Sequence, residues 1–519
     1  MEYLAGYSIP SGYITSIFGL WLAYFLLRAL YNILPLHPLN HIPGPKLAAA
    51  TFLYEAWFDL VLGGRYTHQI KRMHEKYGPV VRINPEELHF NDMKFFDEIY
   101  AGGGRRRDKQ QHFLNFIAGP FTLSMFATRD HDLHRVRRGA INKFFSRGQI
   151  SKLESDVKDL AHQLCDKMIR LGNRDKAPFD LTTVYSCFAS DVISGYCFGE
   201  SFGFVAQDEW EPNFREPLNA FLEITFFFRF FPLFRMVTEV GPLFAKRFSN
   251  NVRNMLLETN ERMPARVRKA IGDYEAGVTH DRPTIFATIL DSQLPDTEKR
   301  EVRLGGEGFS LITAGTETTA WTLTVITFYL LNQPDTLACL TKELQDADAL
   351  NLSWLALEKL PYLSAVISEG LRLAYGVGCR LARIAPTETL VYRGEFNGHK
   401  IEYLIPSGTA MGMSSAIIHH NEDIFPESHA FTPERWVEVE EAQKRRMDGN
   451  LTSFNKGTRQ CVAMNLAYCN LYVAVTALTL RVYPQMSLYQ TGVKDVQYDR
   501  DLFVPRAHKG SQGVRAVIS

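Results

Sequence analysis

One cysteine in a loop is the residue of this chain best suited to chemistry. Cys461 ends the stretch Phe454-Asn455-Lys456-Gly457-Thr458-Arg459-Gln460-Cys461, and an apolar run from Leu466 to Leu480 follows. This order predicts a loop that presents one thiolate at the start of a buried helix, where the helix dipole stabilises it. A structural zinc site needs about four protein ligands, whereas haem iron can use one axial thiolate. Cys461 is therefore a candidate haem ligand, and an inert buried thiol is the alternative.

A second candidate for chemistry interrupts a long apolar run. Phe309 to Leu331 has the length of a buried helix, but Ala314-Gly315-Thr316-Glu317-Thr318-Thr319 lies inside it. Glycine and threonine are poor helix formers, and a charged carboxylate is costly in a buried helix. Such local misfits usually mark function. The alternative is a threonine-rich helix whose hydroxyls bond to its own backbone.

The cysteine loop resembles the ligand loop of the cytochrome P-450 superfamily. The match is at Phe454, Gly457, Arg459 and Cys461, and the departure is at Ala463, where the family usually has glycine. The resemblance covers about residues 39–519, and its motifs occur in the family's order. It implies a mainly α fold with small β-sheets, the cytochrome P-450 fold, behind one N-terminal transmembrane helix.

The resemblance also implies a haem b (iron protoporphyrin IX) cofactor and assigns residues to it. Cys461 would be the iron ligand and Phe454 would belong to the haem pocket. Arg138, Arg383 and Arg459 would bind the propionates, because a guanidinium matches a carboxylate with two parallel bonds. His134 stands where the family often has tryptophan, and Arg380 could face substrate.

Glu317 and Thr318 match the family's acid–alcohol pair, which delivers protons to dioxygen. By the same resemblance, Ala314 and Gly315 would let dioxygen approach through a local opening of the helix, as π-bulges often do. Glu369, Arg372 and Arg435 match a buried ion network that braces the cysteine loop, and removing one member would leave a buried charge unpaired.

The elements that must position these residues can be placed along the chain. The sequence predicts a short strand at 80–83, a helix over 130–146 and a hairpin turn at Asn397-Gly398. Ser151-x-x-Glu154 reads as a capping box that opens a helix. Gly102 to Lys109 and the arginines of the 130–146 helix other than Arg138 are expected to be solvated. The phenylalanine-rich stretch 221–248 is either core or, as favoured here, an apolar lid over an access channel at a membrane surface.

The N-terminus predicts a membrane anchor. Tyr13 to Leu27 is uncharged, Arg28 follows, and prolines crowd the segment to Pro45. A spanning helix needs about 20 residues, so Arg28 would snorkel to the interface. The later positive charges favour a cytosolic C-terminal body. We therefore expect an anchor with the start of a proline hinge at 1–38 and a haem-thiolate domain at 39–519; a cleaved signal peptide is the alternative.

Composition agrees with a large intracellular body. Hydrophobic residues make up 46% of the 519 residues, which is ample for one core. Lys plus Arg and Asp plus Glu are 57 each, and a zero net charge gives no indication of a nucleic-acid partner. The seven cysteines have no zinc-like spacing, and their odd number argues against a disulfide framework.

The predicted function is insertion of one oxygen atom from O2 into an apolar small molecule, with electrons from NADPH through a separate cytochrome P-450 reductase. The motifs resemble fungal enzymes of secondary metabolism of the trichodiene-oxygenase kind, which implies a terpenoid or other polycyclic substrate at the endoplasmic reticulum membrane. Lys444, Arg445, Arg446 and Lys456 either dock the reductase or are solvated. A haem-thiolate isomerase or dehydratase that needs no O2, and a haem carrier or gas sensor, are the alternatives; Glu317-Thr318 argues against both.

Overall fold

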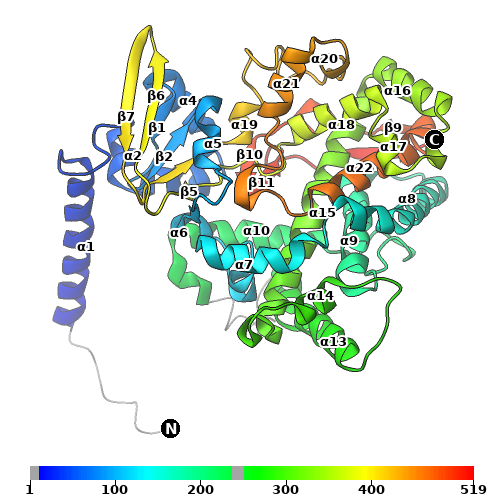
Figure 1. The fold of residues 1–519 in the computed structure, drawn as a ribbon, viewed down its shortest axis with the longest axis horizontal. Coiled ribbons are helices and arrows are strands. Elements are labelled where there is room, and N and C mark those ends of the chain that lie inside the picture. Colours follow the sequence, from blue (N-terminus) through cyan, green and yellow to red (C-terminus); the bar gives the residue numbers. More distant parts are fainter. Residues whose placement is uncertain (1–10, 237–249) are drawn as a thin grey trace.

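The computed structural model describes residues 11–236 and 250–519 of the chain. It is a mostly helical body with small sheets along one side, from which helix α1 (Ser11–Ile33) projects (Figure 1). Thr15–Ile33 is the one helix in the described residues that is long and apolar enough to cross a membrane. The end of α1 is fixed to the body, because Arg28 pairs with Glu86 at 2.8 Å and the Asn32 amide donates to Ala50 O at 2.9 Å.

One long helix forms the centre of the body. Helix α15 (Glu301–Asn332) is buried over most of its length and packs along α9 (Leu181–Phe198). A Cβ at Gly315 would lie 2.9 Å from the Ile193 side chain, so glycine permits this close packing. The expected local opening at Ala314-Gly315 is wrong for this structure, because α15 is α-helical without interruption. Helices α22 (Met464–Arg481), α8 (Arg147–Asp175) and α18 (Pro361–Ala374) complete the core.

A small mixed sheet flanks the helices. Its strand order is β1-β2-β8-β5-β3, with β2 and β8 parallel and the other neighbours antiparallel. The predicted strand at 80–83 is confirmed as β1. The predicted hairpin is confirmed between β6 and β7, and Asn397 and Gly398 both have positive φ, which a type I′ turn requires. The strands are β1 (Val80–Arg82), β2 (Glu87–Phe90), β3 (Asp108–Lys109), β4 (Phe179–Asp180), β5 (Arg383–Ile384), β6 (Leu390–Phe396), β7 (His399–Ile405), β8 (Ala410–Gly412), β9 (Met486–Leu488), β10 (Arg500–Leu502), β11 (Val504–Arg506) and β12 (Arg515–Ile518).

The other helices cover the core and the cavity within it. The predicted helix over 130–146 is confirmed as α7, and the Asp130 carboxylate caps it by accepting from Leu133 N at 2.8 Å. The further helices around the core include α2 (Lys46–Ala50), α3 (Leu53–Ala56), η1 (Trp57–Val61), α4 (Tyr66–Tyr77), α6 (Gln111–Leu114), α7 (His131–Asn142), α10 (Arg215–Phe230), η4 (Pro232–Arg235), α12 (Asn250–Leu257), α13 (Met263–Glu275), α14 (Ile285–Asp291), α16 (Pro334–Asp346) and α21 (Glu441–Asn450).

Two local expectations are wrong. Helix α8 begins at Arg147, one turn before the proposed capping box, and Ser151 and Glu154 instead accept hydrogen bonds from Trp354. Some residues of the basic stretches that were predicted to be solvated are buried: Arg107 is 1% exposed and Lys109 is 3% exposed. Arg137 is likewise buried, with its guanidinium on Glu298 at 2.7 Å.

The phenylalanine-rich stretch 221–248 is partly core and partly surface. Phe221, Phe226 and Phe228 of α10 are buried, whereas Phe231 and Phe234 are exposed. Residues 237–248 of this stretch lie outside the described residues. The buried side chains agree with the core interpretation, and the lid interpretation stays a prediction for the exposed ones.

Candidate functional site

A large cavity opens beside the middle of α15 and reaches the start of α22. Its wall brings together every residue that the sequence predicted for the site: Phe454, Arg459, Cys461, Arg138, Arg383, Glu317 and Thr318. Most other lining side chains are apolar or aromatic, among them Phe116, Phe121, Phe126, Phe221, Leu311 and Phe503. Arg380, which the sequence suggested could face substrate, instead points away from the cavity and donates to Glu55 and Glu87.

The loop before α22 presents Cys461 to this cavity. Its turn requires glycine at 457, where φ is +74° and a Cβ would lie 2.1 Å from Tyr100 O. Cys461 N donates to Phe454 O at 3.0 Å, which closes the loop. Burial raises the pKa of the Cys461 thiol, while an N–H bond from Ala463 and the charge of Arg138 lower it less. A metal cation would reverse that balance, because a coordinating thiol is deprotonated.

Four cations converge beside Cys461 without a carboxylate partner. In the described part of the chain, the hydrogen bonds of Lys109, Arg138, Arg383 and Arg459 all go to backbone carbonyls. Burial, and then the charge of Arg383, lowers the pKa of Arg459 to about 9. Burial and the charges of Arg459 and Arg383 hold the pKa of Lys109 well below its ordinary value. These groups repel one another, so the cluster favours an anionic ligand with two or more charges.

His134 lies against the same cluster. Its imidazole is 4% exposed and lines the cavity, as α7 places it one turn from Arg138. Burial and the neighbouring cations, led by Arg459 and Lys109, lower the pKa of His134 to about 2. The ring is therefore neutral, and one of its nitrogens carries a proton that it can donate.

These residues fit a haem group. A thiol faces the cavity, and four cations that lack an anion stand where two propionates would be neutralised. The sequence did not indicate Lys109, because the run of basic residues around it is typical of a solvated loop. Lys109 lies beside the arginines because β3 pairs with β5, and no local sequence pattern shows that pairing.

The acid and the alcohol of α15 both reach the cavity, yet each has another partner. Thr318 Oγ1 donates to Ala314 O at 3.0 Å. The Glu317 carboxylate, 2% exposed, pairs with Arg506 of β11, which also donates to Asn219 Oδ1 of α10 at 2.8 Å. Burial would raise the pKa of Glu317, but the charges of Arg506 and Arg215 outweigh it and the pKa lies below its ordinary value. Arg506 was missed because no motif places a C-terminal strand against α15.

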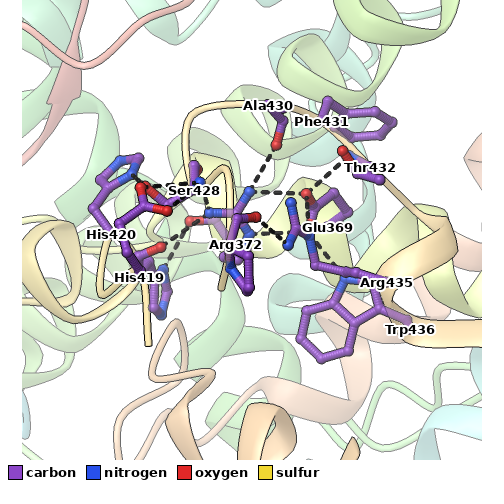
Figure 2. Close-up of polar contacts among 12 residues, drawn as sticks. Glu369, Arg372, His419, His420, Ser428, Ala430, Phe431, Thr432, Arg435 and Trp436 are labelled. Carbon is purple, nitrogen blue, oxygen red and sulfur yellow. Dashed lines mark hydrogen bonds and ion pairs between the residues drawn. The ribbon is translucent and has the colours of Figure 1, made fainter. Parts of the chain in front are cut away.

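The ion network predicted to brace the cysteine loop is confirmed. Glu369 accepts from Arg372 Nε at 2.9 Å and Nη2 at 2.8 Å, and from Arg435 Nε at 3.1 Å (Figure 2). The Glu369 and Arg372 side chains are fully buried. Trp436 Nε1 and Thr432 N also donate to Glu369, and neither contact was predicted.

His419 connects this network to the cysteine loop. Its Nδ1 lies 2.7 Å from Arg372 O, and its Nε2 accepts from Thr452 N at 2.9 Å. Because a backbone N–H can only donate, Nε2 is the acceptor and Nδ1 carries the proton. Burial lowers the pKa of His419 to about 3, so the ring stays neutral and this tautomer persists. Ser453 Oγ adds a second tie to Leu371 O at 2.8 Å.

Comparison with known proteins agrees with this geometry. A family model described as Cytochrome P450 matches residues 43–496. Cytochrome P450 monooxygenase ppzE of Metarhizium majus is 40% identical over 85% of this chain and 95% of its own length. Conidiogenone synthase PchP450 of Penicillium rubens is 37% identical over 94% of this chain and 95% of its own. N-acetyltryptophan 6-hydroxylase ivoC of Emericella nidulans is also 37% identical, over 96% and 97%.

Proposed function

Because this chain belongs to the cytochrome P450 family and is a P450 monooxygenase, we propose that it oxidises an apolar secondary metabolite held against Cys461-ligated haem b. Oxygen insertion is the general reaction of the family, and the relatives at 33–40% identity are fungal enzymes of secondary metabolism. The observation that carries the proposal is the cavity wall itself. It combines one thiol with four unneutralised cations on one side and an apolar, aromatic surface on the other.

The residues would divide the work as follows. Cys461 would hold the iron, and Arg138, Arg383, Arg459 and Lys109 would neutralise the propionates. When bound, the haem supplies the activation of dioxygen. Thr318 would hold a proton at Oγ1 toward the cavity, and Glu317 would pass protons to it from water. Phe454 would pack beside the thiolate, where its ring already contacts Tyr468 with centroids 5.1 Å apart.

The substrate class follows from the lining. Phe116 and Phe503 stack with centroids 5.1 Å apart, and Phe121 lies edge-on to Phe309 at 5.6 Å. Such walls favour a rigid, largely apolar molecule over a charged one, because desolvating a charge without a partner is costly. We propose a terpenoid or another polycyclic intermediate. The names of the relatives, which include N-acetyltryptophan and conidiogenone, favour no single compound.

Electrons would come from NADPH through a separate cytochrome P450 reductase. Arg135 of α7 and Lys143 just after it are exposed and could attract an acidic partner. Helix α7 lies beside the cysteine loop, because Arg138 donates to Gln460 O at 2.6 Å. Arg147 at the start of α8 is exposed too, but it already pairs with Glu358. The 444–446 run is a weaker candidate, since Arg445 already pairs with Glu441. Lys456 likewise pairs with Asp97 at 2.6 Å.

We place the protein at the endoplasmic reticulum membrane, with α1 spanning once and the body in the cytosol. Helix α1 supports this placement, since its apolar side chains are exposed, including Leu20 at 73% and Leu27 at 66%. Two further apolar segments lie at the end of α10. Trp57 and Val61 of η1 and Leu233 and Phe234 of η4 are all more than half exposed.

A carbon monoxide difference spectrum tests the assignment of Cys461. Reduced wild-type protein should show the long-wavelength Soret band of a thiolate-bound ferrous adduct, and Cys461→Ser should lack it. Cys469→Ser, at a buried cysteine outside the cavity wall, is the matched control and should keep the band. Folded wild-type protein that binds haem without the band would refute the proposal. Turnover that needs neither NADPH nor O2 would instead favour an isomerase or dehydratase.

A further inference from the structure

A cluster of buried charges lies outside the site described above. Its members are at most 4% exposed and come from segments far apart in the chain. They are Glu55 of α3, Asp59 of η1, Glu87 of β2, Arg229 of α10, Asp501 of β10, and Arg380, which lies just before β5. Charged side chains are almost never buried to this degree unless they are paired. Three of the four carboxylates contact the two guanidiniums, and Asp501 instead accepts from Thr67 Oγ1 at 3.1 Å, so the cluster is more than a single ion pair.

The cluster lies directly behind the cavity wall. Cys379 and Leu381, on either side of Arg380, line the cavity. Leu222 of α10 lines it seven residues before Arg229, and Phe503 lines it two residues after Asp501. The same elements therefore present apolar side chains to the cavity and charged ones to the cluster. A movement in the cluster would move the wall.

The two guanidiniums are held very differently. Arg380 donates to Glu55 Oε1 at 2.5 Å and to Glu87 Oε1 at 2.9 Å, which fixes its fork. Arg229 has one contact at 3.0 Å, to Glu55, and a longer one at 3.7 Å, to Asp59. Among the described residues, Arg229 Nε has no hydrogen-bond partner. Its guanidinium lies instead against the rings of Phe113 and Phe226, about 6 Å from each centroid.

Arg229 can leave while Glu55 stays paired. Glu55 would still accept from Arg380 and from Asn84 Nδ2 at 2.9 Å, and His112 Nε2 would remain 3.3 Å away. Breaking a buried pair is expensive mainly when one partner stays buried and uncompensated. Here the departing Arg229 would reach water, and Glu55 would keep its other partners. Asp59 would keep the hydrogen bond from Tyr66 N to its Oδ1 at 3.3 Å, and burial, which already raises its pKa, would favour its neutral form. The contact is thus one that can open and close repeatedly.

Helix α10 is held at both ends by arginine. Arg215 at its start pairs with Asp180 and donates to Thr183 Oγ1 at 2.8 Å. Arg229 at its end is the weaker of the two ties, and the exposed residues of η1 and η4 flank it. Release of Arg229 would therefore swing the end of α10 while its start stays in place.

We propose that the contact of Arg229 with Glu55 and Asp59 is a latch that closes α10 over the cavity, and that its release opens the route by which an apolar substrate enters. The latch itself is a contact within the protein and does not depend on haem. Its role in substrate entry rests on the proposed haem monooxygenase function. Two measurements separate these claims, one independent of haem and one that uses it.

Backbone hydrogen exchange of the full-length protein tests the latch without reference to haem chemistry. Arg229→Met keeps an unbranched side chain among the phenylalanine rings and removes the charge. We expect amides in 223–236 to exchange about tenfold faster, while those in 301–332 keep their rates. Arg481→Met removes a more exposed arginine pair remote from α10, with Asp166 at 2.5 Å between α22 and α8, and should leave the exchange of 223–236 unchanged. Equal exchange of 223–236 in wild type and Arg229→Met would overturn the latch.

Stopped-flow binding to the holoenzyme tests the entry route. Clotrimazole, a bulky triphenylmethyl imidazole, should bind the haem of Arg229→Met about tenfold faster than that of wild type, a change of about 1.4 kcal/mol. Imidazole alone should change less than twofold, because a small ligand needs no swing of α10. Glu55→Gln should also accelerate the binding of clotrimazole, and the double variant with Arg229→Met should bind it little faster than either single variant. Faster binding of both ligands, or additive effects of the two substitutions, would refute the proposal.

The two experiments fail in distinguishable ways. Absence of the carbon monoxide band in wild type would remove the proposed function but leave the exchange result valid. If Arg229→Met does not fold, Arg229→Gln, which keeps a polar side chain and removes the charge, is compared in the same way. An unchanged clotrimazole rate and unchanged exchange in Arg229→Gln would overturn the latch.

Discussion

Neutralising Glu369 should destabilise the protein more than any single charge change at its surface. The Glu369 carboxylate accepts five hydrogen bonds, from Arg372 twice, Thr432 N, Arg435 Nε and Trp436 Nε1. Glu369→Gln keeps the shape but replaces one acceptor oxygen by an NH2 group. That group cannot accept from the donors that now surround it.

The size of the effect follows from burial. The Arg372 side chain is fully buried, so without Glu369 its remaining hydrogen-bond partners among the described residues are the carbonyls of His419, Ser428 and Ala430. Removing one partner of a buried ion pair costs about 3–5 kcal/mol. The loss should extend to haem retention, because Arg372 O and His419 hold Thr452 at the start of the cysteine loop.

The matched control is Glu402→Gln. Glu402 pairs with Arg393 at 2.7 Å on the β6–β7 hairpin, where the two side chains are 63% and 71% exposed. An exposed pair is worth about 0–1 kcal/mol.

We would follow urea unfolding by tryptophan fluorescence, and the loss of the carbon monoxide band at one temperature where unfolding is irreversible. A Glu369→Gln protein that resembles Glu402→Gln in both measurements would refute the reasoning about the buried network.

Three further outcomes are expected. Lys109→Met should lose haem to apomyoglobin at least about tenfold faster than wild type, since a hydrogen bond to a charged group is worth about 1.5–3 kcal/mol. Lys456→Met, at an exposed lysine, should lose haem at the wild-type rate. Equal rates of haem loss in Lys109→Met and wild type would contradict the role of Lys109. Thr318→Ala should uncouple turnover, so that NADPH is consumed and peroxide replaces product, and unchanged coupling would count against the proton relay. Burial, against the charge of Arg229, raises the pKa of Asp59 to about 7. The folded state therefore keeps the Asp59 proton to higher pH than the unfolded chain does. Stability should fall as pH rises from about 4 to about 7. Asp59→Asn should flatten that part of the pH profile of thermal unfolding, and an unaltered profile would exclude Asp59 as its source.

The sequence indicated the elements whose signals are local. The loop with Gly457, Arg459 and Cys461 is found from spacing alone, because the turn, the thiol and the following helix are contiguous. The ion network was found for a related reason. Glu369 and Arg372 share one helix face, and the motif around Arg435 is recognisable by itself.

Local patterns misled where a distant partner outweighed them. Ser151 and Glu154 have the spacing of a capping box, yet they lie inside α8 because Trp354 supplies donors for both. The run of basic residues ending at Lys109 is typical of a solvated loop. Pairing of β3 with β5 draws it inward instead, beside three arginines.

By itself the sequence determined the chemistry available to this protein: one thiol in a turn that only glycine permits, an acid and an alcohol in an apolar helix, and an apolar N-terminal segment. Only the tertiary structure decided which charges meet. Arg506 reaches Glu317, Lys109 joins Arg459, and Arg229 meets Glu55 across distances of 174 to 350 residues in the chain. Such pairs leave no periodic or compositional trace, because each partner is selected by packing of remote elements and by the cost of burying a charge alone.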